Sequence, residues 1–394
     1  MFRLVLAIIA CAASAVTQHP TVDELLHGDV ITDYSPYEKT WADFKTAFDR
    51  QYGSSEEEDY RKQLFMDNIK EFEAHNKDYM NGKTTYWKDI NQFTDMTDEE
   101  FASHVHLEPK ESTAGRVKRQ SFGVCSQYTP PTTPTPPASW DWRSRGYVSP
   151  VKDQGNCGSC WAFTTAGAME SRLRILTNLS RSDTLSEQQM VDCFAQNCKG
   201  NYPERAYEYL NRTGGIMSDA AYPYTSGSTR TNQVVAEVTG CQYTTHGDET
   251  AMKSAVYFQG PLSVIIYVTP AFRAYAGGIF DDPNCVQNSS NRTHCLLIVG
   301  YGTSGTGPFW IAKNSWGTTR GLKGYWLMRR GANTCSLASW VNFPQVTPKI
   351  RQNSGAPGGA GGTKSIGTGP SGKLLLVIGH SVLAFLITTV SAKY

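Results

Sequence analysis

Two cysteines separated by two residues, Cys157 and Cys160, lie in the segment Gln154-Gly-Asn-Cys-Gly-Ser-Cys-Trp161. This spacing is compatible with a redox dithiol, half of a zinc site, or a nucleophilic thiol beside a structural cysteine. A zinc site needs a second pair of ligands, and Cys193 and Cys198 have a poor spacing for it. A redox dithiol is expected in a thioredoxin-like strand–helix–strand context, which the residues before Cys157 do not show. The spacing therefore favours a nucleophile that needs no metal or other cofactor.

A nucleophilic thiol needs a base and a group that orients this base. His294 begins the apolar segment Cys295–Val299, which is typical of a buried strand, and Asn314 follows a second such segment, 309–313. Alone, a histidine at a strand start is more often a surface residue, and an asparagine before Ser-Trp-Gly is more often a turn residue. The ordered set of glutamine, cysteine, histidine and asparagine, with these flanks, argues against both simpler interpretations.

These segments resemble those of the papain-like cysteine proteases, and in particular the cathepsin L group. The resemblance spans residues 41–344 and also rests on Leu185-Ser-Glu-Gln-Gln-Met-Val-Asp-Cys193 and on the Gly-Tyr-Gly of residues 300–302. It implies an α+β, papain-like fold with a helical lobe and an antiparallel β-barrel-like lobe, preceded by a mostly helical inhibitory prodomain. Cys160 and His294 would face each other across the cleft between the lobes.

The resemblance gives each residue of the set a role in peptide hydrolysis. An ordinary thiol, with a pKa of ~8.5, is only a few per cent ionised at neutral pH. At a helix N-terminus and beside the His294 imidazolium, Cys160 would be a thiolate that attacks the peptide carbonyl and forms an acyl-enzyme. Asn314 would orient the imidazole, and Trp316 would shield their hydrogen bond from water. The Gln154 side chain and the Cys160 backbone N–H would form the oxyanion hole.

The substrate cleft implied by the resemblance departs from the family pattern. The segment after Cys198 usually reads Asn-Gly-Gly but is Lys-Gly-Asn here, and Trp340 stands where the S2 pocket normally has a smaller residue. We therefore expect a shallow S2 pocket that resists phenylalanine at the P2 position of a substrate. The expected substrate-binding residues are Gly200, Asn201, Tyr202, Pro203, Ile265, Trp316 and Trp340.

The chain has ten cysteines, which secretion would make candidates for disulfides. The resemblance implies the pairs Cys157–Cys198, Cys193–Cys241 and Cys285–Cys335, and it requires Cys160 to stay reduced. Cys125 and Cys295 remain. They could pair with each other if cleavage after Arg119 leaves Cys125 on the mature enzyme, whereas a cut near Pro137 would remove it.

A helical stripe upstream of the peptidase segments predicts an inhibitory propeptide. Its six positions are spaced three or four residues apart and share one helix face: Glu57, Arg61, Phe65, Asn68, Phe72 and Asn76. With Asn91-x-Phe93-x-Asp95 they resemble the cathepsin L propeptide, apart from Phe72 for isoleucine and Asp89 for glycine. Residues 41–101 carry 8 Lys/Arg and 15 Asp/Glu, a net −7, against 18 and 14, a net +4, in residues 138–345. Because docking would weaken as carboxylates protonate, we expect activation to be fastest in acid.

Both ends of the chain are apolar and indicate the secretory pathway. Residues 1–15 fit a signal peptide, and residues 374–394 fit a GPI-attachment signal better than a short transmembrane helix. Four N-x-[ST] sequons agree with that route: Asn178, Asn211, Asn288 and Asn291. The expected divisions are signal peptide 1–15, propeptide start 16–40, prodomain 41–101, activation segment with Pro-rich linker 102–137, peptidase 138–345, Gly-rich linker 346–373 and hydrophobic tail 374–394.

The composition limits the classes of partner. A net charge of +1 argues against a nucleic-acid-binding protein. The expected partners are peptide and protein substrates, the chain's own propeptide, cystatin-type inhibitors by resemblance, and a membrane through the C-terminal anchor. The expected location is a lysosome or endosome, or the extracellular side of the cell. Two alternatives stay open: a catalytically silent surface binding protein on the same fold, and an oxidoreductase with Cys157 bonded to Cys160.

Overall fold

The computed structural model of this chain describes most of the prodomain and peptidase segments. The expected signal peptide, the sequons at Asn178, Asn288 and Asn291, the basic site ending at Arg119 and the C-terminal tail lie outside the described residues. Among the helices that are described, none combines the length and apolar character that crossing a membrane requires. The described ranges are 19–105, 123–177, 184–196, 198–224, 234–285, 292–319 and 321–349.

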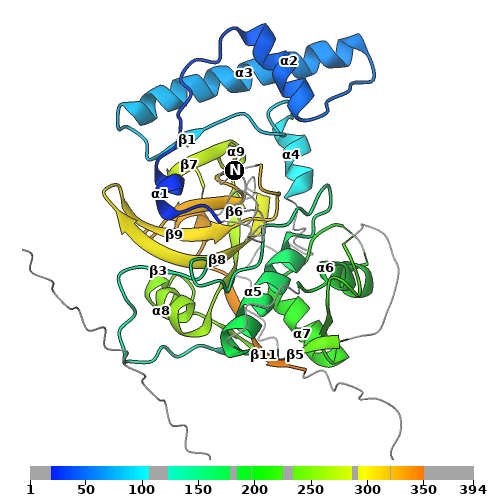
Figure 1. The fold of residues 1–394 in the computed structure, drawn as a ribbon, viewed down its shortest axis with the longest axis vertical. Helices are drawn as coiled ribbons and strands as arrows, with labels where there is room; N and C mark the ends of the chain where they lie inside the picture. Colours follow the sequence, from blue (N-terminus) through cyan, green and yellow to red (C-terminus); the bar gives the residue numbers. More distant parts are fainter. Residues whose placement is uncertain are drawn as a thin grey trace, which may run out of the picture. The chain divides into compact units, whose positions relative to one another are not determined.

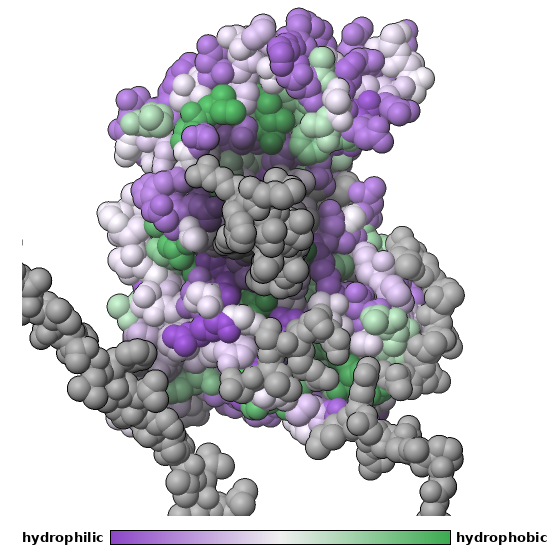
Figure 2. Space-filling view, in the orientation of Figure 1, coloured by the Kyte–Doolittle hydropathy of each residue, from purple (hydrophilic) through white to green (hydrophobic). Residues whose placement is uncertain are grey.

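The N-terminal part is mostly helical, as predicted. The long helix α3 begins after Ser54, whose hydroxyl accepts from Glu57 N, and its first turn is acidic, which suits a helix N-terminus. Helix α3 lies beside α2 (Figure 1). Its buried residues Phe65, Ile69 and Phe72 pack with Trp41 and Phe44 of α2 into a small separate core. The outer face of this pair of helices is mainly hydrophilic (Figure 2). The elements are α1 (Val22–Leu26), α2 (Tyr37–Ala47), α3 (Ser55–Met80), β1 (Tyr86–Lys88) and α4 (Asp98–His104).

A helical lobe and a sheet-containing lobe follow, which confirms the predicted fold class. The central helix α5 (Cys160–Thr177) is buried along almost its whole length, and its side chains form the core of the helical lobe with those of α7 (Pro203–Thr213). Pro203 occupies the first turn of α7, where a missing N–H costs nothing. The shorter elements α6 (Glu187–Met190) and η1 (Val191–Ala195) lie between these two helices in the sequence.

The sheet of this lobe is mostly antiparallel, and its strands are hydrogen-bonded in an open path. The order is β1-β7-β10-β9-β8-β6-β11-β5-β2, and the β10–β7 and β2–β5 pairs are parallel. Its remaining elements are β2 (Cys125–Gln127), β3 (Trp140–Asp141), β4 (Ile216–Met217), β5 (Val234–Tyr243), α8 (Glu249–Gln259), β6 (Leu262–Val268), α9 (Pro270–Arg273), β7 (Tyr275–Phe280), β8 (Arg292–Ser304), β9 (Gly307–Lys313), β10 (Tyr325–Arg329), η2 (Thr334–Ser336) and β11 (Val341–Pro348).

The long strand β8 carries His294 into the interior. It pairs with β6, where Ile266 stands opposite His294, and with β9, which ends immediately before Asn314. Farther along β8, Gly300 lets β3 approach, because a Cβ at this position would lie only 2.4 Å from the Trp140 carbonyl oxygen. The register of three strands therefore fixes where the imidazole enters the site.

Two of the three expected disulfides are confirmed and one is wrong. Cys157–Cys198 and Cys285–Cys335 are formed. Cys241 bonds to Cys125 instead of Cys193, because β2 pairs in parallel with β5 and places Cys125 directly opposite Cys241, with a Cα–Cα distance of 4.3 Å.

This pairing has two consequences for the other cysteines. A Cys125–Cys295 bridge is wrong too, and the described cysteines outside disulfides are Cys160, Cys193 and Cys295. The bond between Cys157 and Cys198 also rules out the oxidoreductase alternative, which required Cys157 to bond to Cys160.

Candidate active site

Cys160 is the first residue of α5 and is completely buried. The loop before it is held by the Cys157–Cys198 disulfide and by a hydrogen bond from Gly158 N to the Cys198 carbonyl at 2.9 Å. Ser159 precedes the helix, and its carbonyl accepts the backbone N–H groups of the first turn. The loop thus fixes the sulfur at the positive end of a long buried helix.

His294 lies between an asparagine and the Cys160 thiol, as predicted. Its Nε2 is 2.8 Å from Asn314 Oδ1, and the ring itself interacts with Cys160. The indole of Trp316 stacks on the imidazole with ring centroids 4.6 Å apart, and both side chains are almost fully buried. The imidazole is therefore oriented from one edge and covered on one face.

The surroundings of Cys160 favour its thiolate. Burial acts to raise the pKa of this thiol, but a hydrogen bond from Cys295 and the charge and hydrogen bond of His294 outweigh it. The pKa of Cys160 is therefore well below its ordinary value, which is the condition a cysteine nucleophile needs. The sequence predicted the contribution of His294 but not that of Cys295.

Gln154 is fixed next to the same helix. Its side-chain Nε2 donates to the Cys157 carbonyl at 2.9 Å, and its Oε1 accepts from the Ser315 hydroxyl at 2.6 Å. Its backbone N–H donates to the Ser315 carbonyl at 2.8 Å, so the loop and the segment after β9 hold each other. The amide is thus positioned by both lobes before any substrate arrives.

Several predicted substrate-binding residues come together beside Cys160. The rings of Tyr202 and Trp340 are 6.5 Å apart, and the Trp340 carbonyl accepts from Ile265 N at 3.1 Å. All three belong to or pack against the apolar cluster that contains Cys160.

The other predicted residues flank this group. Pro203 and the Asn201 side chain, which accepts from Tyr202 N at 2.9 Å, lie at the start of α7, and Gly200 has a φ of 96°. Trp316, the last of the predicted residues, stacks on His294 instead. The sequon residue Asn211 is exposed on α7, while its Nδ2 donates to the Val238 carbonyl at 2.8 Å; its glycosylation stays a prediction.

A buried polar cluster lies behind Asn314, and sequence reasoning missed it. Lys152 contacts Glu187 at 2.8 Å, and burial raises the pKa of Glu187 to about 7. Burial also lowers the pKa of Lys313, the residue before Asn314, to about 8. Lys313 donates to the Ser149 hydroxyl at 3.1 Å. The cluster thus anchors the residue that precedes Asn314.

The prodomain reaches the catalytic residues through aromatic and backbone contacts. Phe93 and Phe101 pack edge-on against Trp316, with centroid distances of 5.5 and 5.7 Å. Asn91 Nδ2 donates to the Arg273 carbonyl at 2.8 Å, and the Arg273 guanidinium lies 3.3 Å from Asp98. The prodomain strand β1 also pairs with β7 of the sheet. The propeptide therefore packs against Trp316, whose indole stacks on the His294 imidazole.

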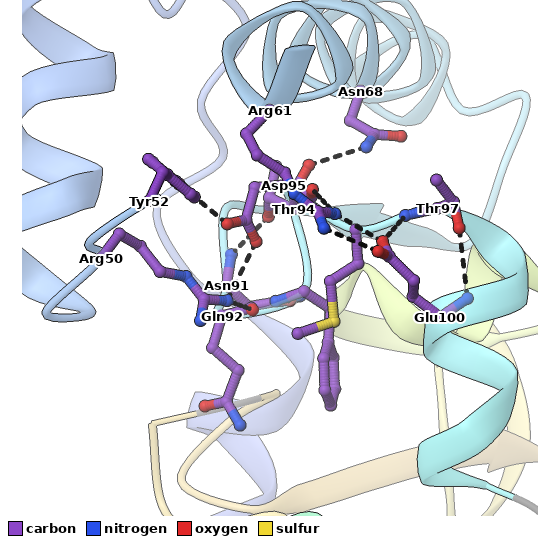
Figure 3. Close-up of polar contacts among 12 residues, drawn as sticks. Arg50, Tyr52, Arg61, Asn68, Asn91, Gln92, Thr94, Asp95, Thr97 and Glu100 are labelled. Carbon is purple, nitrogen blue, oxygen red and sulfur yellow. Dashed lines mark hydrogen bonds and ion pairs between the residues drawn. The ribbon is translucent and has the colours of Figure 1, made fainter. Parts of the chain in front are cut away.

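Charged and polar side chains of the prodomain hold the loop that contains Phe93 (Figure 3). Asp95 accepts from Arg50 at 2.9 Å and from the Tyr52 hydroxyl at 3.0 Å, while Asn68 donates to the Thr94 carbonyl at 2.8 Å. Arg61 makes a two-bond contact with Glu100 at 2.5 and 2.7 Å. The sequence predicted Arg61, Asn68 and Asp95 as members of the propeptide pattern but not these contacts, and Arg50, Tyr52 and Glu100 lay outside that pattern.

The Arg61–Glu100 pair gives the prodomain a defined response to pH. Hydrogen bonds from Arg61 lower the pKa of Glu100 from 4.5 to about 2. A carboxylate with a lowered folded-state pKa stabilises the fold above its unfolded value, and this contribution is lost as the pH falls from 4.5 towards 2. Burial raises the pKa of Asp89, so this group acts in the opposite sense and favours the docked prodomain as the pH falls.

We expect Glu100→Gln to speed removal of the prodomain about two- to fivefold at pH 5 to 6, since a partly exposed pair contributes modestly. Between pH 4.5 and 3, the rate should rise less steeply in the variant than in the wild type. Gel analysis of zymogen processing against pH measures both effects, and Glu99→Gln, at an exposed neighbouring position, is the matched control. Wild-type processing at pH 7.5 that is as fast as at pH 4.5 would contradict the acid-release mechanism.

Comparisons with known proteins agree with this geometry. Residues 136–345 match the family described as papain family cysteine protease, and residues 41–101 match the cathepsin propeptide inhibitor domain (I29). The chain is 38% identical over 318 residues to digestive cysteine proteinase 1 of Homarus americanus, covering 78% of this chain and 94% of that protein. It is 40% identical over 302 residues to pro-cathepsin H of Bos taurus, covering 74% and 85%. The solved structure of digestive procathepsin L2 proteinase from Tenebrio molitor larval midgut matches with a TM-score of 0.71 at 36% identity, covering 78% and 99%.

Proposed function

Because this chain belongs to the papain family of cysteine proteases and carries an I29 propeptide, we propose that Cys160 is its nucleophile and His294 its general acid–base. The observation that carries the proposal is the lowered pKa of Cys160 beside an imidazole held by Asn314. The thiolate attacks the substrate carbonyl, an acyl-enzyme forms as the amine leaves with a proton from His294, and water then releases the acid. The Gln154 amide and the Cys160 N–H face the developing oxyanion.

The proposal is tested by labelling with an epoxysuccinyl peptide. The zymogen is first allowed to process in acid, and the labelled protein is digested and mapped by mass spectrometry. We expect one adduct, on Cys160, together with a stoichiometric loss of peptide hydrolysis. Hydrolysis that survives complete labelling, or a chain that binds peptides without cleaving them, would favour the surface binding protein.

We propose that the mature enzyme keeps Cys125. The Tyr128 hydroxyl contacts the Ser254 hydroxyl at 3.1 Å, and the Tyr128 backbone N–H donates to the Tyr243 carbonyl at 2.8 Å. Together with the Cys125–Cys241 bond and β2, these contacts make the segment part of the peptidase sheet. We therefore expect processing before Cys125, and N-terminal sequencing of the active form would show the start.

We propose a secreted enzyme that acts in an endosome or lysosome, or outside the cell, tethered through the segment 374–394. The support is the apolar leader, the terminal apolar tail and the sequons. Release from cells by a phosphatidylinositol-specific phospholipase would support a GPI anchor, and retention would contradict it. Peptide and protein substrates are expected to share the cleft with the propeptide and with cystatin-type inhibitors.

We further propose that Trp340 makes the S2 pocket shallow. Its ring lies 6.5 Å from that of Tyr202, and its backbone is bonded to that of Ile265, so the indole would occupy space that a large P2 side chain needs. Trp340→Ala should therefore raise kcat/KM about tenfold for substrates with phenylalanine at P2, and change it much less for valine. Trp340→Phe is the matched variant and should give an intermediate gain. A wild-type enzyme that already prefers phenylalanine at P2 would contradict this assignment.

A further inference from the structure

Cys295 is a buried cysteine that the proposed hydrolysis does not use. It follows His294 directly on β8, stands opposite Ile265 of β6, and is only 1% exposed. It forms no disulfide, and it belongs to the same apolar cluster as Cys160. A second thiol therefore lies in the interior of the candidate active site, on the strand that also delivers the base.

The two thiols lie in one buried cluster and influence each other's ionisation. Neither is accessible to solvent beyond 1% in the zymogen. Burial, together with the hydrogen bonding and charge of Cys160, raises the pKa of Cys295 well above its ordinary value, so Cys295 keeps its proton. One sulfur of the pair is thus a nucleophile, and the other is a protonated thiol in the same buried cluster.

We infer that Cys160 and Cys295 form a dithiol which hydrogen peroxide converts into a disulfide, so that oxidation switches the protease off reversibly. This inference rests on the proposed role of Cys160 as the nucleophile. It also assigns a function to Cys295, for which the sequence suggested only a bridge to Cys125.

The chemistry balances with peroxide as the two-electron oxidant. The Cys160 thiolate attacks one peroxide oxygen, an S–O bond forms, the O–O bond breaks, and the leaving hydroxide takes up a proton as water. Cys295 sulfur then attacks the sulfenic sulfur, the S–O bond breaks, and the departing hydroxide leaves as a second water with the Cys295 proton. Two thiols are oxidised to one disulfide, and peroxide is reduced to two waters.

The disulfide sets a geometric condition on the pair. It requires a sulfur–sulfur distance of about 2.05 Å, with the Cα atoms within about 7 Å. Burial of both side chains in one cluster is the feature that favours this approach. Without a second thiol, a sulfenic acid at Cys160 would be oxidised further to the sulfinic and sulfonic acids, which thiol reductants do not reverse.

The test compares three proteins, each expressed as the full chain and processed in acid: wild type, Cys295→Ala and Cys193→Ala. Cys193 is the matched control, a second unbonded cysteine, located in η1. Each enzyme is titrated for active sites, exposed to excess hydrogen peroxide until its activity is lost, and treated with dithiothreitol. Activity is expressed relative to the same enzyme before oxidation, and non-reduced peptides are mapped by mass spectrometry.

We expect wild type and Cys193→Ala to yield a Cys160–Cys295 peptide pair and to recover at least about fivefold more activity than Cys295→Ala. In Cys295→Ala, the Cys160 peptide should carry two or three added oxygens. Equal recovery in all three proteins, or a wild-type Cys160 peptide that carries oxygens and no partner, would overturn the inference. Labelling of Cys160 by the epoxysuccinyl peptide before oxidation reports the proposed function separately, so failure of the disulfide alone leaves that function standing.

Discussion

Replacing Cys160 with alanine is expected to lower kcat/KM for peptide substrates by about 10⁵-fold or more, because the whole reaction passes through its sulfur. The variant zymogen should also stay at full length in acid, where the wild type loses its prodomain. Alanine is a good helix former, and the position is the first of α5, so the fold should be retained. The measurement is a gel time course in acid, followed by peptide hydrolysis after the variant has been cut by added wild-type enzyme.

Two further variants separate the nucleophile from its supports. Asn314→Ala removes the acceptor that lies 2.8 Å from His294 Nε2. It should lower kcat/KM about 10²-fold, the scale expected when a catalytic group is only misplaced. Cys193→Ala removes another unbonded thiol and should leave the rate unchanged. A Cys160→Ala enzyme that retained more than a tenth of wild-type activity would exclude this thiol as the nucleophile.

The catalytic set was predictable because each member stands in a local pattern with a physical meaning. Cys160 opens a helix, His294 starts an apolar strand and Asn314 ends another, so the sequence marks the three positions although they are far apart in the chain. The helical stripe in α3 was predictable for the same reason. Its members Phe65, Phe72 and Asn76 are indeed buried, whereas Glu57 lies near the surface in an ion pair with Arg61.

The remaining features depend on which strands pair, and local patterns do not contain that information. The predicted partner of Cys241 was wrong because the three residues of β2 contain no pattern that indicates parallel pairing with β5. The influence of Cys295 on the ionisation of Cys160 needs the register of β6 and β8 and the position of α5 at once. Arg273 binds the prodomain although it lies 177 residues from Met96, whose carbonyl accepts from it at 3.1 Å.

Phe93→Ala should release the prodomain from the catalytic residues and make the uncut zymogen react with thiol reagents far faster. Phe93 is 1% exposed and packs against Phe101 at 5.0 Å and against Trp316 at 5.5 Å, while Trp316 stacks on His294. Loss of a buried phenylalanine side chain costs about 3–5 kcal/mol, which corresponds to about 10²- to 4 × 10³-fold in the undocked fraction. The labelling rate of Cys160 at neutral pH should rise by that factor.

The position of Phe93 makes this a test of docking rather than of prodomain folding. Its ring belongs to the apolar cluster that includes Trp316 and the sheet, and not to the separate core of α2 and α3. Circular dichroism of the variant should therefore show the wild-type helix content even while Cys160 becomes reactive. Tyr60→Ala, at a side chain that is 52% exposed on α3, is the matched control and should label at the wild-type rate. If Phe93→Ala also labels slowly, the aromatic contact with Trp316 does not hold the prodomain, and the hydrogen bonds of Asn91 and β1 must do so.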